Sequence, residues 1–170
     1  MLERKVENAG RRTRYTLTAA GRELQPVIAA LLEWGAAWAF GEPRSTELNP
    51  LLLMWWMRDR VHRELLPQAR VVVEFDFRLP SAQHYWMVLE RSDVSVCLTH
   101  PGFAVDVVVL ADLAAFHKVW LGRRTFSDAV RDQQVELDAL PRLMRAFPDW
   151  FAWSAAAETV RVAAQRTQPA

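Results

Sequence analysis

The chain has 170 residues, of which 51% are hydrophobic and 24% charged, and its formal net charge is +1. This composition is typical of a globular protein, and the near-neutral charge excludes a molecule that binds polyanions with its whole surface. The single cysteine, Cys97, excludes an intramolecular disulfide and favours a reducing compartment.

Two patterns concern location. The longest apolar run covers 51–57 and is far shorter than the roughly 20 residues that span a membrane. The first residues lead into polar sequence and not into the apolar run of a signal peptide. We therefore expect a cytoplasmic protein without a membrane span.

The basic residues are concentrated at the start of the chain. Residues 1–25 carry six Arg or Lys against three Glu, a net charge of +3, so the remainder sums to −2. A basic N-terminal segment joined to a mildly acidic remainder suits a local contact with phosphate groups.

The first predicted elements are a hairpin and a helix. Residues 2–6 and 12–17 alternate in polarity on either side of a loop, which predicts a β-hairpin. Thr18 stands at the N-cap position of a helix with apolar residues at three- and four-residue spacing. Pro26 is expected to kink this helix. The segment 41–46 reads as a linker.

The apolar stripe of this helix needs a partner, because a unit of fewer than about 40 residues rarely encloses a core of its own. The partner is either residues 47–153 or a second copy of the chain. Gly35 permits close approach of two helices, and Trp34 adds contact area. We favour a homodimer, with contacts from Leu24, Val27, Ile28, Leu31, Gly35 and Trp38.

The rest of the chain predicts a sheet with helices. Asn49 and Pro50 begin a helix that is expected to reach about Leu66. The first two turns of this helix are apolar on all sides, so we expect other elements to cover most of their surface. The elements expected after it are strands at 71–77, 85–90, 94–98 and 104–110, a helix at 112–121, a short helix capped by Thr125, a strand at 135–138 and a helix from Pro141. The residues after Ser154 are predicted to form a frayed helix or to be disordered.

A family resemblance rests on the segment Tyr-Thr-Leu-Thr-Ala-Ala-Gly-Arg-Glu-Leu at 15–24, with Pro-Val at 26–27 and Trp-Gly at 34–35. The pattern is similar to that of the HxlR-type winged-helix regulators, where it spans the second wing strand and the dimerisation helix. The resemblance covers about residues 1–40. It implies contacts of the wing with DNA phosphates or the minor groove, which give affinity more than specificity, through Arg4, Lys5, Arg11, Arg12 and Arg14. The alternative is a solvated charged hairpin.

This sequence departs from the family at its start. A winged helix reads the major groove with a recognition helix placed just before the wing, whereas this chain begins at the wing. Either the natural protein starts further upstream, or sequence-specific reading has been lost.

A second resemblance rests on 109–113, 119–124, 127–130 and 135–137. Their order is similar to the second half of a sterol carrier protein domain, although Gln133 and Ala139 replace two common glycines around the last strand. The resemblance implies a twisted sheet covered by helices, with an apolar cavity between them. Composition does not separate a hollow core from a packed one. The residues expected to line the cavity are Trp55, Trp56, Phe75, Trp86 and Trp120.

Catalytic motifs are missing from the sequence. The six glycines are too scattered for a phosphate-binding loop, and the four histidines lie on separate elements without an HExxH pattern. We therefore expect no enzyme activity, metal or cofactor.

Taken together, these patterns predict an α+β protein. Its expected parts are the C-terminal part of a winged-helix module at 1–41, a sterol carrier protein-like domain at 47–153 and a tail at 154–170. The function that these parts imply is a DNA-binding transcription regulator with a domain that senses a hydrophobic small molecule. The alternative is a lipid or hydrophobic-metabolite carrier that dimerises through its N-terminal helix without binding DNA.

Overall fold

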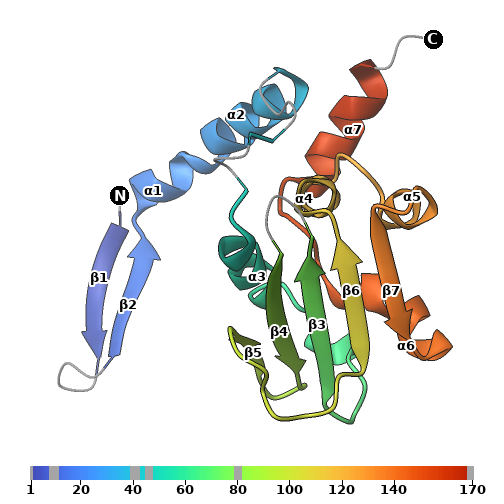
Figure 1. The fold of residues 1–170 in the computed structure, drawn as a ribbon. Coiled ribbons are helices and arrows are strands. Elements are labelled where there is room, and N and C mark those ends of the chain that lie inside the picture. The colour runs from blue at the N-terminus through green and yellow to red at the C-terminus, as the bar shows by residue number, and fades with distance from the viewer. Residues whose placement is uncertain (1, 8–11, 39–42, 45–47, 79–81, 168–170) are drawn as a thin grey trace.

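The computed structural model describes residues 2–7, 12–38, 43–44, 48–78 and 82–167 (Figure 1). The N-terminal part consists of an antiparallel ladder of β1 (Leu2–Glu7) and β2 (Arg12–Leu17), followed by α1 (Ala19–Glu23) and α2 (Gln25–Trp38). The predicted hairpin and helix are therefore confirmed.

A five-stranded sheet forms the centre of the second part. Its strands are β3 (Val71–Phe77), β4 (Gln83–Leu89), β5 (Val94–Cys97), β6 (Val107–Ala111) and β7 (Val135–Ala139). Their order is β5-β4-β3-β6-β7, with β3 and β6 parallel and the other neighbours antiparallel.

Helices provide the second layer. They are α3 (Pro50–Arg58), α4 (Leu113–Trp120), α5 (Phe126–Arg131) and α6 (Pro141–Ala146), with short 3₁₀ turns η2 (Arg63–Leu65) and η3 (Phe147–Trp150). A last helix, α7 (Ala157–Thr167), lies outside this layer. The predicted α+β class, a sheet covered by helices, is confirmed.

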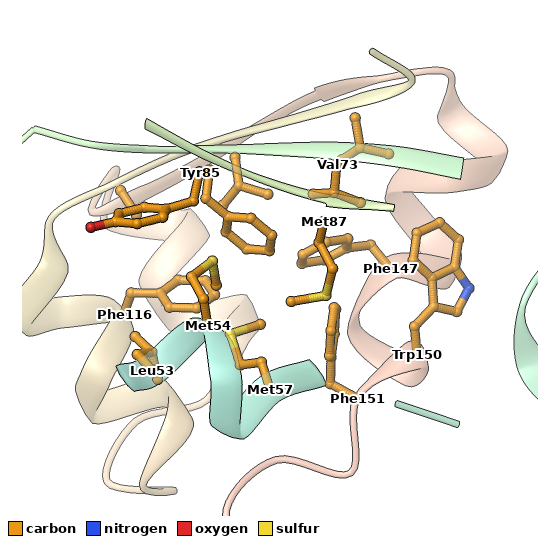
Figure 2. Close-up of a cluster of buried hydrophobic side chains, with 14 of the residues drawn as sticks. Leu53, Met54, Met57, Val73, Tyr85, Met87, Phe116, Phe147, Trp150 and Phe151 are labelled. Atoms are coloured by element: carbon orange, nitrogen blue, oxygen red, sulfur yellow. The ribbon is translucent and has the colours of Figure 1, made fainter. Parts of the chain in front are cut away.

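The core lies between one face of the sheet and the helices (Figure 2). Alternate residues of β3 and β4 point into it, and Met54 and Met57 rise from α3 to meet them. The ring of Phe75 lies 5.9 Å from that of Phe116 and 6.3 Å from that of Phe147, measured between centroids. The middle of this layer is thus packed with side chains.

The predicted N-caps are present at the starts of three helices. The amide of Gly21 donates to Thr18 Oγ1 at 3.1 Å, and the amide of Ala115 donates to Asp112 Oδ1 at 2.7 Å. Thr125 caps α5 in the same way, and its hydroxyl also donates to the carboxylate of Asp128. This hydrogen bond and the neighbouring Arg131 hold the pKa of Asp128 below its ordinary value.

The first helix is interrupted beside its proline. The α1 segment ends at Glu23, and α2 begins at Gln25, one residue before Pro26. Proline has no amide hydrogen, so the carbonyl of Arg22 lacks its usual helical partner four residues on. The expected disturbance at Pro26 is therefore a break between two helices.

The α3 helix is shorter than predicted, since it ends at Arg58 and not near Leu66. The reason is a long-range backbone pairing. The amide of His62 donates to the carbonyl of Trp150 at 2.8 Å, and the amide of Ala152 donates to that of Arg60 at 2.8 Å. These groups pair with a distant segment instead of continuing the helix. The expected coverage of α3 is also wrong, because Leu52, Trp55 and Trp56 are each 43% exposed.

The C-terminal segment forms a helix, one of the two alternatives predicted for it, and this helix is docked on α2. Ala156 and Val160 pack with Ala36 and Leu32 of α2 in a small cluster of their own. Figure 1 shows α7 leaving the sheet layer and lying beside α2. The helix therefore ties the last part of the chain to the first.

A glycine after α4 allows the start of α7 to approach closely. Gly122 has φ +78°, and a Cβ built there would lie 2.2 Å from the carbonyl oxygen of Ala157. Gly102 has a similar φ of +82°, but nothing lies within 4 Å of its Cβ position. The two glycines thus share one backbone conformation and differ in their surroundings.

Replacing each glycine with alanine separates the cost of the left-handed backbone from the cost of the steric contact with Ala157. We expect Gly102→Ala to cost about 1–2 kcal/mol for the left-handed backbone alone. Gly122→Ala should cost about 2–4 kcal/mol and expose the amides of α7 to exchange, because the methyl group also displaces Ala157. Urea unfolding and amide hydrogen exchange measure both effects. Equal losses with α7 still protected would contradict the close contact.

Candidate functional site

An exposed apolar surface runs along α1 and α2. We call it the α2 apolar face and define it by Leu24, Val27, Ile28, Leu31, Trp34 and Trp38, which are all exposed. Trp38 is 78% exposed and Ile28 62%. Large apolar side chains gathered in this way are uncommon on an isolated protein surface and mark a contact with another molecule.

A different side of α2 makes the internal contact with α7. Leu32 is half-buried and Ala36 is 6% exposed, and both belong to the cluster with Val160. Gly35, which was predicted to contact a second copy, is buried within this chain. The other five predicted dimerisation residues remain on the open face, so docking on the rest of the chain does not cover the predicted stripe.

The wing lies next to this face. In the ladder, Lys5 pairs with Arg14, Glu7 with Arg12, and Arg4 with Tyr15. Arg4 is therefore in register with an aromatic residue, whereas the other two pairs join charged residues. Arg11 lies outside the described residues. The guanidinium of Arg22 donates to the carbonyl of Leu17 at 2.8 Å and so fastens α1 to the end of β2.

Of the residues predicted to line a cavity, Phe75 and Trp120 belong to the buried core cluster, whereas Trp55, Trp56 and Trp86 do not. Phe75 is in register with the buried Tyr85, whereas Trp86 is in register with Glu74 and donates to its carboxylate at 3.1 Å. Successive residues of a strand point to opposite faces, so Trp86 lies on the other side of the sheet from Phe75. Trp120 is buried at the end of α4, and Trp55 and Trp56 are partly exposed on α3.

Two adjoining hollows lie instead near the 3₁₀ turns and α6. The first, which we call the rim hollow, has a volume of about 440 Å³, and the second about 500 Å³. They share Leu65, Ala146 and Trp150. The residues that line the rim hollow are Leu65, Leu66, Pro67, Ala69, Arg70, Val71, Arg91, Asp106, Arg142, Leu143, Ala146 and Trp150.

Both hollows fall within the size range of small-molecule sites. The floor of the rim hollow is mainly apolar, and three arginines stand around it. Sequence reasoning missed this site because its walls come from four separate segments, none of which carries a recognisable motif.

In the described ranges, His, Cys, Asp and Glu side chains form no group of three or more that could hold a metal ion. No helix among these residues combines the length and the hydropathy that crossing a bilayer requires.

Comparison with known proteins supports the resemblance of the N-terminal part. A family model described as an HxlR-like helix-turn-helix matches residues 1–43. No curated protein matches the chain.

Solved structures similar to this chain include an alkylsulfatase and sterol carrier protein domains. The stereoselective inverting sec-alkylsulfatase Pisa1 from Pseudomonas sp. is 13% identical, with a TM-score of 0.54 over 65% of this chain, and the match spans only 17% of the sulfatase. The sterol carrier protein domain 2 of Helicoverpa armigera is 14% identical over 76% of this chain and 99% of that domain, with a TM-score of 0.46. The ubiquinone synthesis protein UbiJ-SCP2 is 14% identical over 82% of this chain and 98% of that protein, with a TM-score of 0.40.

Proposed function

We propose that the chain is a cytoplasmic, non-enzymatic, DNA-binding transcription regulator of the HxlR type, and that its second part senses a hydrophobic small molecule. The observation that carries this proposal is the open α2 apolar face beside a basic wing, within the segment that the HxlR-like model matches. A second copy of the chain covers this face and sets two wings at a fixed spacing.

The covering of the face by a second copy has a physical basis. Aromatic and aliphatic side chains of this size lose unfavourable contact with water when they are buried, at about 25 cal/mol per Å². Trp34 and Trp38 provide large, rigid contact areas of the kind that dominates protein interfaces. The half-buried Leu32 lies on another side of α2, so the internal contact leaves the α2 apolar face free for the proposed dimer contact.

The link between ligand and wing runs through α7. The segment that lines the second hollow includes Trp150, Phe151 and Trp153, and α7 begins a few residues later. The amide of Ser154 donates to the carbonyl of Trp120 at 3.0 Å, which holds this segment to α4. A ligand that moves the segment also moves α7 and, with it, α2. Coupling of this kind is typically worth 1–3 kcal/mol between two sites.

DNA binding is tested with the double variant Arg12→Ala, Arg14→Ala on mixed-sequence duplex DNA at low salt. We expect weaker binding and a smaller dependence of log affinity on log salt, by about one for each phosphate contact removed. Arg131→Ala, an exposed cation on α5, is the matched control and should change neither quantity.

Two outcomes would contradict the regulator. Unchanged affinity of the wing variant at low salt would remove the wing from the DNA contact. A dimer with bound small molecule but no salt-dependent DNA affinity would favour the hydrophobic-metabolite carrier instead.

A further inference from the structure

We infer that the outer face of the sheet, which is the face opposite the core, binds the basic wing of a second copy of the chain. The contact itself does not depend on the proposed function, whereas its consequence, competition between this face and DNA for the wing, rests on it. Three features of the molecule support the contact: the charge of the face, the position of Trp86 and the charge pattern of the wing.

The outer face carries an excess of negative charge. The five strands contain no Lys or Arg, and their alternation places four carboxylates on this face, those of Glu74 and Asp76 on β3 and of Glu136 and Asp138 on β7. Arg78, just after β3, offsets one of these charges, because it donates to the carboxylate of Glu136 at 3.2 Å. Asp138 is exposed and makes no hydrogen bond or ion pair with the residues that the structure describes. The face therefore attracts a cationic partner.

The carboxylates flank an apolar strip on the strand between them. Val108 and Leu110 of β6 are half-buried, and each lies in register between one carboxylate of β3 and one of β7. Neighbouring strands are about 4.8 Å apart, so the two carboxylate pairs are separated by roughly 10 Å. A two-stranded ribbon has the same strand spacing, and the aliphatic stems of Lys and Arg pack on apolar surface while their charged ends reach a carboxylate.

Trp86 provides an aromatic surface on the same face, at its β4 side. Its indole nitrogen donates to the carboxylate of Glu74 at 3.1 Å, which holds the ring beside a negative charge. The ring of His84 lies nearly parallel to it, with the centroids 6.3 Å apart, and the ring of His100 meets it edge-on at 5.7 Å. A guanidinium can stack on an indole ring and donate to a neighbouring carboxylate. An arginine side chain thus finds both kinds of contact in one place.

The wing carries the complementary charge. Lys5 and Arg14 lie directly opposite each other in the ladder, and Arg12 is two residues from Arg14 and so lies on the same face. Glu7 lies opposite Arg12, whereas no carboxylate lies opposite Lys5 or Arg14. Like charges in this position destabilise a ladder, so an anionic partner stabilises it. Figure 1 shows the wing standing apart from the sheet, and we therefore assign the contact to a second copy and not to the same chain.

The test uses the NMR signal of the Trp86 indole proton, identified with Trp86→Phe, as a reporter in the full chain. A ¹⁵N-labelled Arg12→Ala, Arg14→Ala variant keeps the outer face but lacks two cations of the wing. At low salt, unlabelled protein without substitutions should shift the signal, and the unlabelled wing variant should bind about tenfold more weakly or less, because charge-assisted contacts are lost. Exchange of subunits through the α2 apolar face is the same for both. Salt at 1 M, which screens charges beyond about 3 Å, should abolish the shift.

Variants of the reporter test the face itself. Asp76→Asn with Asp138→Asn should weaken the binding of protein without substitutions by about tenfold or more, because two carboxylates of the face are neutralised. The matched control is Asp59→Asn with Asp93→Asn, which neutralises two exposed carboxylates outside this face and should leave the affinity unchanged. Absence of a shift, equal shifts with and without the wing cations, or equal weakening by the two double variants would overturn the contact.

Duplex DNA added to the mixture distinguishes the contact from the proposed function. DNA that binds the wing should displace it from the outer face and restore the original Trp86 signal. A shift that DNA does not reverse would retain the contact and contradict DNA binding by the wing. Salt-dependent DNA binding by the wing without any shift would retain the regulator and remove the contact.

Discussion

Replacing Ile28 and Leu31 with aspartate is expected to convert the proposed dimer into a monomer. Both side chains are well exposed in the single chain, so the protomer should fold as before. In the dimer, each buried Ile or Leu contributes about 1.5–3 kcal/mol, and both copies lose two of them. Buried carboxylates add a desolvation penalty. We expect the dissociation constant to rise at least about a hundredfold, since each 1.4 kcal/mol is a factor of ten.

Sedimentation equilibrium or native mass spectrometry measures this change. Glu33→Gln alters the charge of the same helix at an exposed position outside the α2 apolar face and should leave the dimer intact. If the protein without substitutions is monomeric at high concentration, the proposed pairing of two wings is contradicted. A double variant that remains dimeric would place the contact elsewhere.

The second large effect is expected in the core, from Phe147→Ala. The side chain is fully buried, and its ring lies 5.3 Å from that of Phe151 and 5.6 Å from that of Phe126, between centroids. Loss of a buried phenylalanine ring leaves a cavity and costs about 3–5 kcal/mol. We expect this loss in the free energy of unfolding by urea, measured at a fixed protein concentration because a dimer contributes to stability.

Trp55→Ala provides the comparison for the core variant. Trp55 is also a large aromatic residue, but it is 43% exposed on α3 with the guanidinium of Arg58 over its ring at 5.1 Å. Its removal should cost much less than that of Phe147, because 43% of its surface already contacts water whereas Phe147 is fully buried. Similar losses for the two variants would show that burial does not rank their contributions correctly.

Elements set by local pattern could be predicted from the sequence. The alternation in β3, the caps at Thr18, Asp112 and Thr125, and the break beside Pro26 depend on residues within a few positions of one another. These signals are strong because neighbouring backbone groups satisfy them. The turn before β7 does not belong with them, since Gln133 adopts φ +58°, a conformation that a glutamine does not predict.

Features made by distant segments could not be predicted in the same way. The end of α3 depends on the pairing of 60–62 with 150–152, and the rim hollow joins four separate segments. The position of Trp86 is a different case. Alternation of Tyr85, Met87 and Leu89 on the inner face places Trp86 on the outer face, so the sequence already held the reason why it does not share a cavity with Phe75.

The docking of α7 on α2 has a consequence for the order in which the chain is made. A ribosome produces α2 before α7, on the order of ten seconds apart at cellular rates of synthesis. During that interval Leu32 and Ala36 have no cover from their own chain. The small size of Ala36 limits the apolar surface that the growing chain presents there. The α7 helix thus covers α2 only after the sheet has been made, and a chain cut before Ala157 would keep its sheet but leave this side of α2 open.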